Sequence, residues 1–159
     1  MNKNITIVII VLVLVVGGLV FFKNQSVEAP AGKLPAGSVP AGDFDRAKDQ
    51  VWTWEKTVMG DGTTVLPKKA EAFTITFASD NKVSGTTDCN RFGGSYQVGS
   101  DGILTLGSLV STKMFCEGSQ EEEFTTAVAK TGHYIIDEAG NLALLLSADS
   151  GTIFFKKNQ

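Results

Sequence analysis

Residues 83–96 read VSGTTDCNRFGGSY, and the character of the folded part of the chain is decided in this stretch. Polar turn residues at its centre separate two segments that favour strands, Lys82–Thr86 and Gly94–Val98. Because the link between them is short, the two strands are expected to pair antiparallel as a hairpin. Asn90, Gly93 and Gly94 are expected to allow its tight turn. A phosphate-binding loop is the alternative, but no strand–loop–helix context surrounds these residues and no Lys-Ser or Lys-Thr follows them.

The same alternation of short strands and turn residues extends over residues 49–159. Turns rich in Gly, Asp and Asn separate the expected strands, and most links are short enough for hairpins. The expected strands are Val51–Val58, Phe73–Ala78, Lys82–Thr86, Gly94–Val98, Ile103–Leu109, His133–Asp137, Leu142–Leu146 and Thr152–Lys156. The pattern predicts a mainly β (α+β) domain, a compact antiparallel β-barrel-like fold of about eight strands with one helix. Its expected core aromatics are Trp52, Trp54, Phe92 and Tyr96.

One segment departs from the strand pattern and predicts the helix, after the fifth strand. Ser119 and Glu122 have the spacing of a capping box, in which each side chain satisfies a backbone N–H at the helix start. The expected apolar face consists of Phe124, Ala127 and Val128. Gly132 is expected to end the helix. The acidic run Glu121–Glu123 suits the positive end of a helix dipole, and a metal site is the alternative for it.

The segment from Ile5 to Phe22 is apolar apart from Thr6 and a glycine pair. A helix of this length covers about 27 Å, close to the apolar thickness of a bilayer. Residues 1–23 are therefore predicted to be an N-terminal transmembrane signal-anchor, with the lipid bilayer as a partner. Cleavage is the alternative: a site after Ala29 is opposed by Pro30, and a second site, after Ala31, lies nine residues past the apolar end. No Cys directly follows the segment for lipid attachment. The short N-terminal tail favours an extracytoplasmic domain, periplasmic or at the cell surface.

Residues 24–48 are predicted to be a flexible linker, which places the folded domain at residues 49–159. Pro-Ala-Gly recurs there at residues 30–32, 35–37 and 40–42, and this composition disfavours both helices and strand ladders. As a flexible coil the linker would span roughly 25–30 Å.

Charge excludes one class of partner. Residues 24–159 contain 12 basic and 17 acidic side chains, a net charge of −5. Such a surface repels phosphates, so no nucleic-acid partner is expected.

Two blocks of the chain resemble the signature of the META domain family, which includes the bacterial HslJ-type heat-shock proteins. The matching residues are Gly85, Cys89, Asn90, Gly94, Tyr96, Thr112, Met114 and Cys116. The resemblance covers about residues 50–157, but Asp88 stands where the family often has Gly. It implies a compact β-domain with one helix, usually in the cell envelope and linked to heat stress. It implies no enzyme and no cofactor.

Cys89 and Cys116 are the only cysteines of the chain, one in each block. A disulfide is the natural expectation for an extracytoplasmic domain, while two free thiols or a reactive or metal-bound pair are alternatives. His133, the single histidine, matches no metal-ligand spacing with them, so no metal site is expected. Arg91 and Lys113 could pair with Asp88 or Glu117, and no catalytic role is assigned to them.

Three functional hypotheses follow. The first is a non-enzymatic envelope module that binds an unknown protein or ligand, in connection with stress. The second is a structural surface domain, and the third is a thiol-dependent redox protein that uses Cys89 and Cys116.

Overall fold

The computed structural model describes residues 41–158, with side chains from residue 44 onward. The predicted transmembrane segment, Ile5 to Phe22, and residues 24–40 of the predicted linker lie outside the described residues. Within the described range, none of the helices has both the length and the apolar character needed to cross a bilayer.

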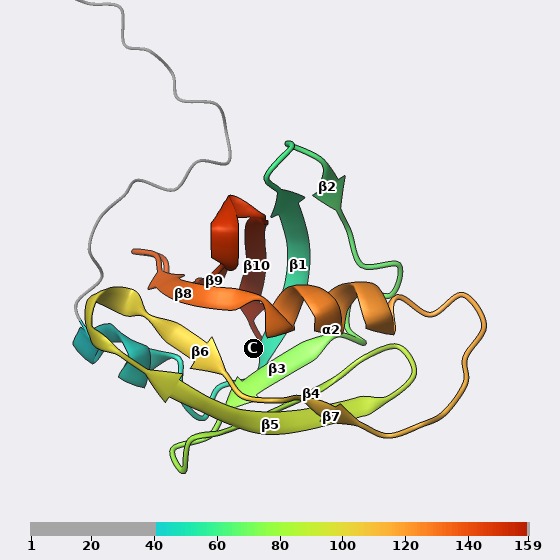
Figure 1. The fold of residues 1–159 in the computed structure, drawn as a ribbon, viewed down its shortest axis with the longest axis horizontal. Coiled ribbons are helices and arrows are strands. Elements are labelled where there is room, and N and C mark those ends of the chain that lie inside the picture. The colour runs from blue at the N-terminus through green and yellow to red at the C-terminus, as the bar shows by residue number, and fades with distance from the viewer. Residues whose placement is uncertain (1–40, 159) are drawn as a thin grey trace, which may run out of the picture. The chain divides into compact units, whose positions relative to one another are not determined.

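Ten strands and one α-helix form the described part of the chain (Figure 1). The strands are β1 (Trp52–Met59), β2 (Thr64–Val65), β3 (Thr74–Phe77), β4 (Lys82–Thr86), β5 (Arg91–Val98), β6 (Leu104–Leu106), β7 (Val110–Ser111), β8 (Thr131–Ile136), β9 (Leu142–Leu146) and β10 (Gly151–Lys157). The helices are η1 (Ala41–Arg46), η2 (Ser100–Gly102), α2 (Glu121–Ala129) and η3 (Ser147–Asp149). Eight of the strands match the predicted ones, while β2 and β7 are additional pairs of residues along β1 and β5.

The strands form one antiparallel sheet in the order β6-β5-β4-β3-β1-β10-β9-β8. The sheet curves until its two ends, β6 and β8, approach each other. An isolated β-bridge joins them, between Ile103 directly before β6 and His133 in β8. Figure 1 shows α2 running across the molecule and leading directly into β8. The prediction of a mainly β, barrel-like fold with one helix is confirmed, and the barrel is nearly closed.

Aromatic side chains fill the core, as the sequence predicts. Trp52, Trp54, Phe92 and Tyr96 are all buried. Around α2, the ring of Phe124 lies 5.1 Å from that of Trp54 and 5.3 Å from that of Phe73. Phe124 and Val128 are the buried residues of α2, and the partly buried Ala127 packs against the core, so the predicted apolar face is correct.

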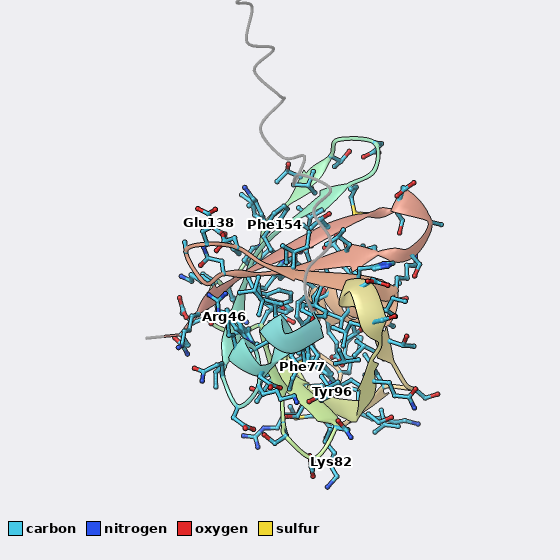
Figure 2. All side chains as sticks on the ribbon, turned by 90° about the vertical axis from the view of Figure 1, so that its left-hand side faces the viewer. Arg46, Phe77, Lys82, Tyr96, Glu138 and Phe154 are labelled. Carbon is cyan, nitrogen blue, oxygen red and sulfur yellow. A yellow bond between two sulfur atoms is a disulfide. The ribbon has the colours of Figure 1, made fainter. Side chains whose placement is uncertain are left out.

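The domain reaches back into the segment predicted to be linker. Phe44 is 1% exposed, and its ring packs 5.3 Å from that of Phe77 and 5.4 Å from that of Tyr96. Figure 2 shows Phe77 and Tyr96 beneath η1, the short helix that includes Phe44. Ala47 is also buried, and its carbonyl accepts a hydrogen bond from the Trp52 indole N–H at 2.9 Å. The folded part therefore begins before residue 49.

Both predicted helix boundaries differ in detail from the structure. Gln120, not Ser119, is the N-cap residue, and the carboxylate of Glu122 makes no bond back to Ser119. Gly132 does not end the helix, because it lies inside β8. Instead, the hydroxyl of Thr131 donates to the carbonyl of Val128 at 2.7 Å and closes the last turn. A local side-chain bond thus replaces the expected glycine stop.

Candidate functional site

The turn between β4 and β5 is formed by Thr87–Asn90, and not by the glycines that the sequence indicated. The Thr87 hydroxyl accepts the backbone N–H of Asn90 at 2.8 Å and that of Cys89 at 3.2 Å. Gly93 and Gly94 lie inside β5. The turn prediction for these two glycines is wrong because a threonine side chain supplies the hydrogen bonds that shape the turn.

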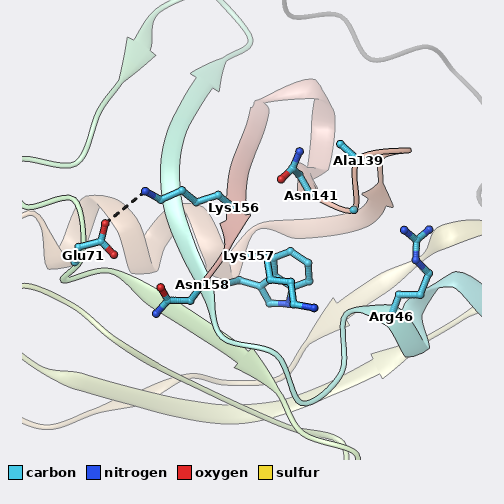
Figure 3. A pocket seen from close by; sticks show the side chains of 9 residues that line it. Arg46, Glu71, Ala139, Asn141, Lys156, Lys157 and Asn158 are labelled. Carbon is cyan, nitrogen blue, oxygen red and sulfur yellow. Dashed lines mark hydrogen bonds and ion pairs between the residues drawn. The ribbon is translucent and has the colours of Figure 1, made fainter.

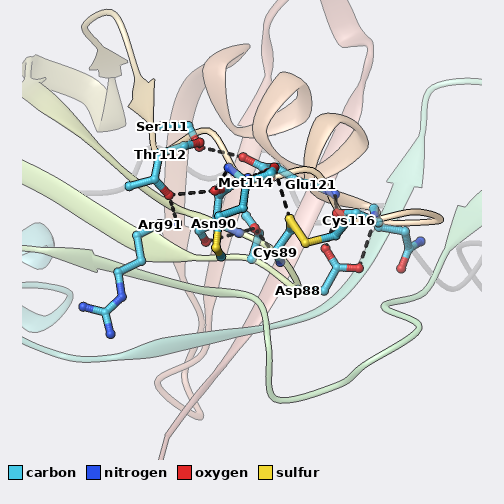
Figure 4. Close-up of a disulfide and its surroundings, with 12 residues drawn as sticks. Asp88, Cys89, Asn90, Arg91, Ser111, Thr112, Met114, Cys116 and Glu121 are labelled. Atoms are coloured by element: carbon cyan, nitrogen blue, oxygen red, sulfur yellow. Dashed lines mark hydrogen bonds between the residues drawn. A yellow bond between two sulfur atoms is a disulfide. The ribbon is translucent and has the colours of Figure 1, made fainter.

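Asn90 connects this turn to the segment Ser111–Cys116 (Figure 4). Its amide nitrogen donates to the Met114 carbonyl at 3.0 Å and to Glu121 Oε2 at 2.6 Å. Its amide oxygen accepts from the Thr112 hydroxyl at 2.7 Å and from the Met114 N–H at 2.9 Å. Every donor and acceptor of this buried side chain is thus used, which favours one rigid arrangement.

A disulfide bond between Cys89 and Cys116 makes a second connection between the same segments, with their Cα atoms 5.8 Å apart. The chain has no other cysteines, so the structure contains no free thiol. The disulfide is therefore present, and not the two free thiols or the reactive or metal-bound pair that the sequence left open. We call the turn Thr87–Asn90 together with Ser111–Cys116 the motif cluster.

Asp88 attaches the motif cluster to the start of α2. Its carboxylate accepts the Ser119 hydroxyl at 2.5 Å and the backbone N–H of Gln120 at 3.0 Å. The Ser119 oxygen in turn accepts the N–H of Glu121 at 3.1 Å. Backbone N–H groups at the first turn of a helix need such acceptors, and negative charge is favoured there. Asp88, 31 residues before Ser119 in the chain, thus takes the capping role that the sequence pattern assigned to Glu122.

Glu121 completes the network, since its Oε1 accepts the hydroxyl of Ser111 at 2.6 Å. The first residue of the acidic run Glu121–Glu123 thus has a structural contact. Among the described residues, no group of three or more His, Cys, Asp or Glu side chains is placed to hold a metal. His133 is exposed on β8. Ion pairs of Arg91 and Lys113 with Asp88 or Glu117 do not occur among the salt bridges of residues 44–158.

The remaining predicted motif residues have roles in packing. A Cβ atom at Gly85 would collide with the Thr74 carbonyl and the Phe92 ring, and one at Gly94 would meet the Leu109 side chain at 2.9 Å. The Tyr96 hydroxyl donates to the carbonyl of Ala78 at 2.7 Å, and burial raises its pKa.

The motif cluster exposes an apolar tip, Met114 and Phe115. Phe115 is 93% exposed and Met114 is 63% exposed, although both residues belong to a tightly bonded segment. A cavity of about 370 Å³ adjoins them, and its walls include the disulfide and the Glu122 and Thr125 side chains of α2. Sequence reasoning listed Met114 as a motif residue and missed Phe115. The signal was an aromatic residue directly beside a cysteine in the second block.

The fold and the motif cluster define a small, nearly closed β-barrel domain with a disulfide-linked loop against its one α-helix. Comparisons with known proteins agree with this class. The model of the META domain family matches residues 46–159, so the chain belongs to the META domain family.

Two solved structures share the fold. One is the NMR structure of a protein from Burkholderia xenovorans, at 22% identity and a TM-score of 0.62, covering 83% of this chain and 98% of that one. The other is the crystal structure of a DUF4847 family protein from Bacteroides vulgatus, at 17% identity and a TM-score of 0.55, covering 73% of this chain and 99% of that one. No curated protein matches the chain.

Proposed function

We propose that this protein is a non-enzymatic binding module of the cell envelope with a role in the stress response. In this proposal, the segment from Ile5 to Phe22 anchors the chain in the membrane as a single helix. The linker then carries the META domain on the extracytoplasmic side. The domain binds an envelope protein through the Met114–Phe115 tip.

The observation that carries the proposal is the nearly complete exposure of Phe115 on a rigid segment. Burying a phenylalanine side chain stabilises a complex by roughly 1.5–3 kcal/mol. The backbone of Met114 is already held by Asn90 through both its N–H and its carbonyl. Cys116, directly after Phe115, is held by the disulfide. Because the tip is ordered before binding, little conformational entropy remains to be lost when it docks.

The chemistry around the tip defines the expected partner. The domain is acidic overall, and anionic lipid headgroups would be repelled by it. A recess of apolar side chains on another protein, wide enough for one aromatic ring, fits the tip better than a lipid surface does. The disulfide supports the extracytoplasmic placement, because such bonds persist in oxidising compartments.

Photocrosslinking in intact membranes tests the proposed interface. A photoreactive phenylalanine analogue replaces Phe115 in the full chain, and in a matched control it replaces Val51, an exposed apolar residue outside the motif cluster. We expect a discrete protein adduct from position 115 that is missing from position 51. Equal adducts from both positions, or adducts to lipid alone, would contradict the proposal.

Membrane orientation needs a separate measurement. A membrane-impermeant amine reagent is added to intact cells, and labelling of Lys156 and Lys157 near the C-terminus is read by mass spectrometry. We expect labelling before lysis. If labelling requires lysis, the domain faces the cytoplasm.

A further inference from the structure

A groove of about 860 Å³, formed by residues outside the motif cluster, has no role in the proposed function (Figure 3). Five parts of the chain line it, and Trp52 of β1 and Glu71 account for two of them. Arg46 comes from η1, residues 139–141 form the turn between β8 and β9, and residues 156–158 lie at the end of β10. The volume lies within the range of roughly 300–1,000 Å³ that is typical of small-molecule sites.

Positive charge is concentrated in this groove. Arg46, Lys156 and Lys157 line it, and Glu71 is the one acidic lining residue. Lys156 Nζ and Glu71 Oε1 form an ion pair at 3.4 Å, which is the dashed line in Figure 3. Arg46 and Lys157 take part in none of the salt bridges among the described side chains. The groove therefore has a net charge of about +2 on a domain whose overall charge is negative.

The β8–β9 turn contains two acidic residues, and neither of them lines the groove. Asp137 accepts the backbone N–H of Asn141 at 2.7 Å and its side-chain N–H at 3.0 Å, so this carboxylate is engaged within the turn. Glu138 does not line the groove. Gly140, at the turn's tip, has a φ of +84°, and a Cβ there would lie 3.6 Å from an Arg46 guanidinium nitrogen. A glycine at this position thus leaves space beside the guanidinium.

We propose that this groove binds an anionic ligand that bears at least two carboxylate or phosphate groups. A guanidinium group presents a planar fork of N–H donors that matches one such group, and Lys157 offers a second positive charge for another. The field of the surrounding acidic surface disfavours anions elsewhere on the domain, which directs them to this groove.

Isothermal titration of the full chain in neutral lipid nanodiscs tests the proposal, with inorganic pyrophosphate and citrate as probes. We expect at least one probe to bind at one site per chain. The variant R46Q/K157Q should weaken this binding at least tenfold. The control variant K69Q/K130Q removes the same charge from exposed residues outside the groove and should bind within twofold of the wild type.

Preference for pyrophosphate would identify the ligand class as phosphate, and preference for citrate would identify it as carboxylate. The single charge reversal K157E provides a second variant should R46Q/K157Q lose its fold, and it should also weaken binding at least tenfold. No binding of either probe, or equal weakening in the groove and control variants, would overturn the proposal. Crosslinking at Phe115 is read independently, so either proposal can fail without the other.

Discussion

The carboxylate of Asp88 accepts the backbone N–H of Gln120 at 3.0 Å, although 32 residues separate them in the chain. The contact joins the turn between β4 and β5 to the start of α2. Asp88 stands where the family often has Gly, so this bond gives the departure from the family pattern a structural role in this chain. The start of the helix is therefore capped both by Ser119 next to it and by Asp88 from another part of the fold.

Replacing Asp88 by Ala should destabilise the domain by about 1–2 kcal/mol, the usual cost of losing a helix cap. The Gln120 N–H and the Ser119 hydroxyl would both lose their acceptor. The free energy of unfolding from urea denaturation measures the effect. Glu138→Ala, which removes an exposed carboxylate, is the control and should stay within about 0.5 kcal/mol of the wild type. Equal losses in both variants would contradict the capping role.

Replacing Asn90 by Ala should cost about 3 kcal/mol or more, because it removes four hydrogen bonds, two to the Met114 backbone and one each to the Thr112 and Glu121 side chains. Asn90→Asp preserves the shape but places a carboxylate against Glu121 and the Met114 carbonyl. We expect it to be destabilising too, and both variants should speed amide hydrogen exchange at Met114. Unchanged exchange would show that the side chain does not hold the tip.

Removing the disulfide with the double variant C89S/C116S should reduce the free energy of unfolding by roughly 3–4 kcal/mol, from the entropy of a loop that spans 27 residues. Chemical denaturation with and without a reducing agent measures this loss. The reductant should destabilise the wild type by a similar amount and leave the double variant unaffected. A wild type insensitive to complete reduction would show that the bond contributes little.

Two glycines of the hairpin should respond differently to alanine. Gly85→Ala forces a methyl group into the Thr74 carbonyl and the Phe92 ring, and we expect a loss of about 3 kcal/mol or more. At Gly93 the nearest atom to a new Cβ is the Val83 carbonyl oxygen at 3.5 Å, an ordinary contact. Gly93→Ala should therefore be neutral or stabilise by up to about 1 kcal/mol. Thermal unfolding of both variants measures the difference, and a similar melting temperature for the two would contradict it.

The stability contribution of Asp137 should depend on pH. Burial alone would raise the pKa of Asp137, but hydrogen bonds from the Asn141 backbone and side chain, with smaller backbone contributions, outweigh it and lower the pKa below 3.8. Because the pKa of Asp137 is lower in the folded state, its carboxylate stabilises the fold at any pH above the pKa of the unfolded chain. This stabilisation is lost as the pH falls through the pKa of the folded state. Asp137→Asn should therefore be less stable than the wild type at pH 7. The gap in free energy of unfolding should shrink below pH 4, whereas a constant gap would contradict this assignment.

Local patterns were sufficient to predict most of the architecture. Alternating strand and turn signals located eight strands, because strand propensity and turn chemistry depend on neighbouring residues. The two missed strands, β2 and β7, contain two residues each and have no periodicity to detect. The aromatic core was predicted for the same reason, since large apolar side chains are buried in any compact arrangement of these strands.

The motif cluster was predicted only as a list of residues. Family resemblance indicated Cys89, Asn90, Thr112 and Cys116, and the structure shows that they meet. The positions of Asp88, Ser111 and Glu121 in the same network could not be derived, because their partners are distant in the chain. The misplaced turn at Gly93 and Gly94 has a related cause: the hydrogen bonds of the Thr87 side chain, not backbone freedom, shape that turn.

The sequence by itself determined that this chain contains a β-rich domain with one helix, because those elements arise from short-range periodicity. Only the tertiary structure decided what the stretch at residues 83–96 does. Its turn is joined to Ser111–Cys116 by a disulfide and by the hydrogen bonds of Asn90, and it caps α2 through Asp88. Phe115, in the segment held by these bonds, is left exposed. Contacts between residues 22–32 positions apart depend on the path of the whole sheet, and no local pattern encodes that path.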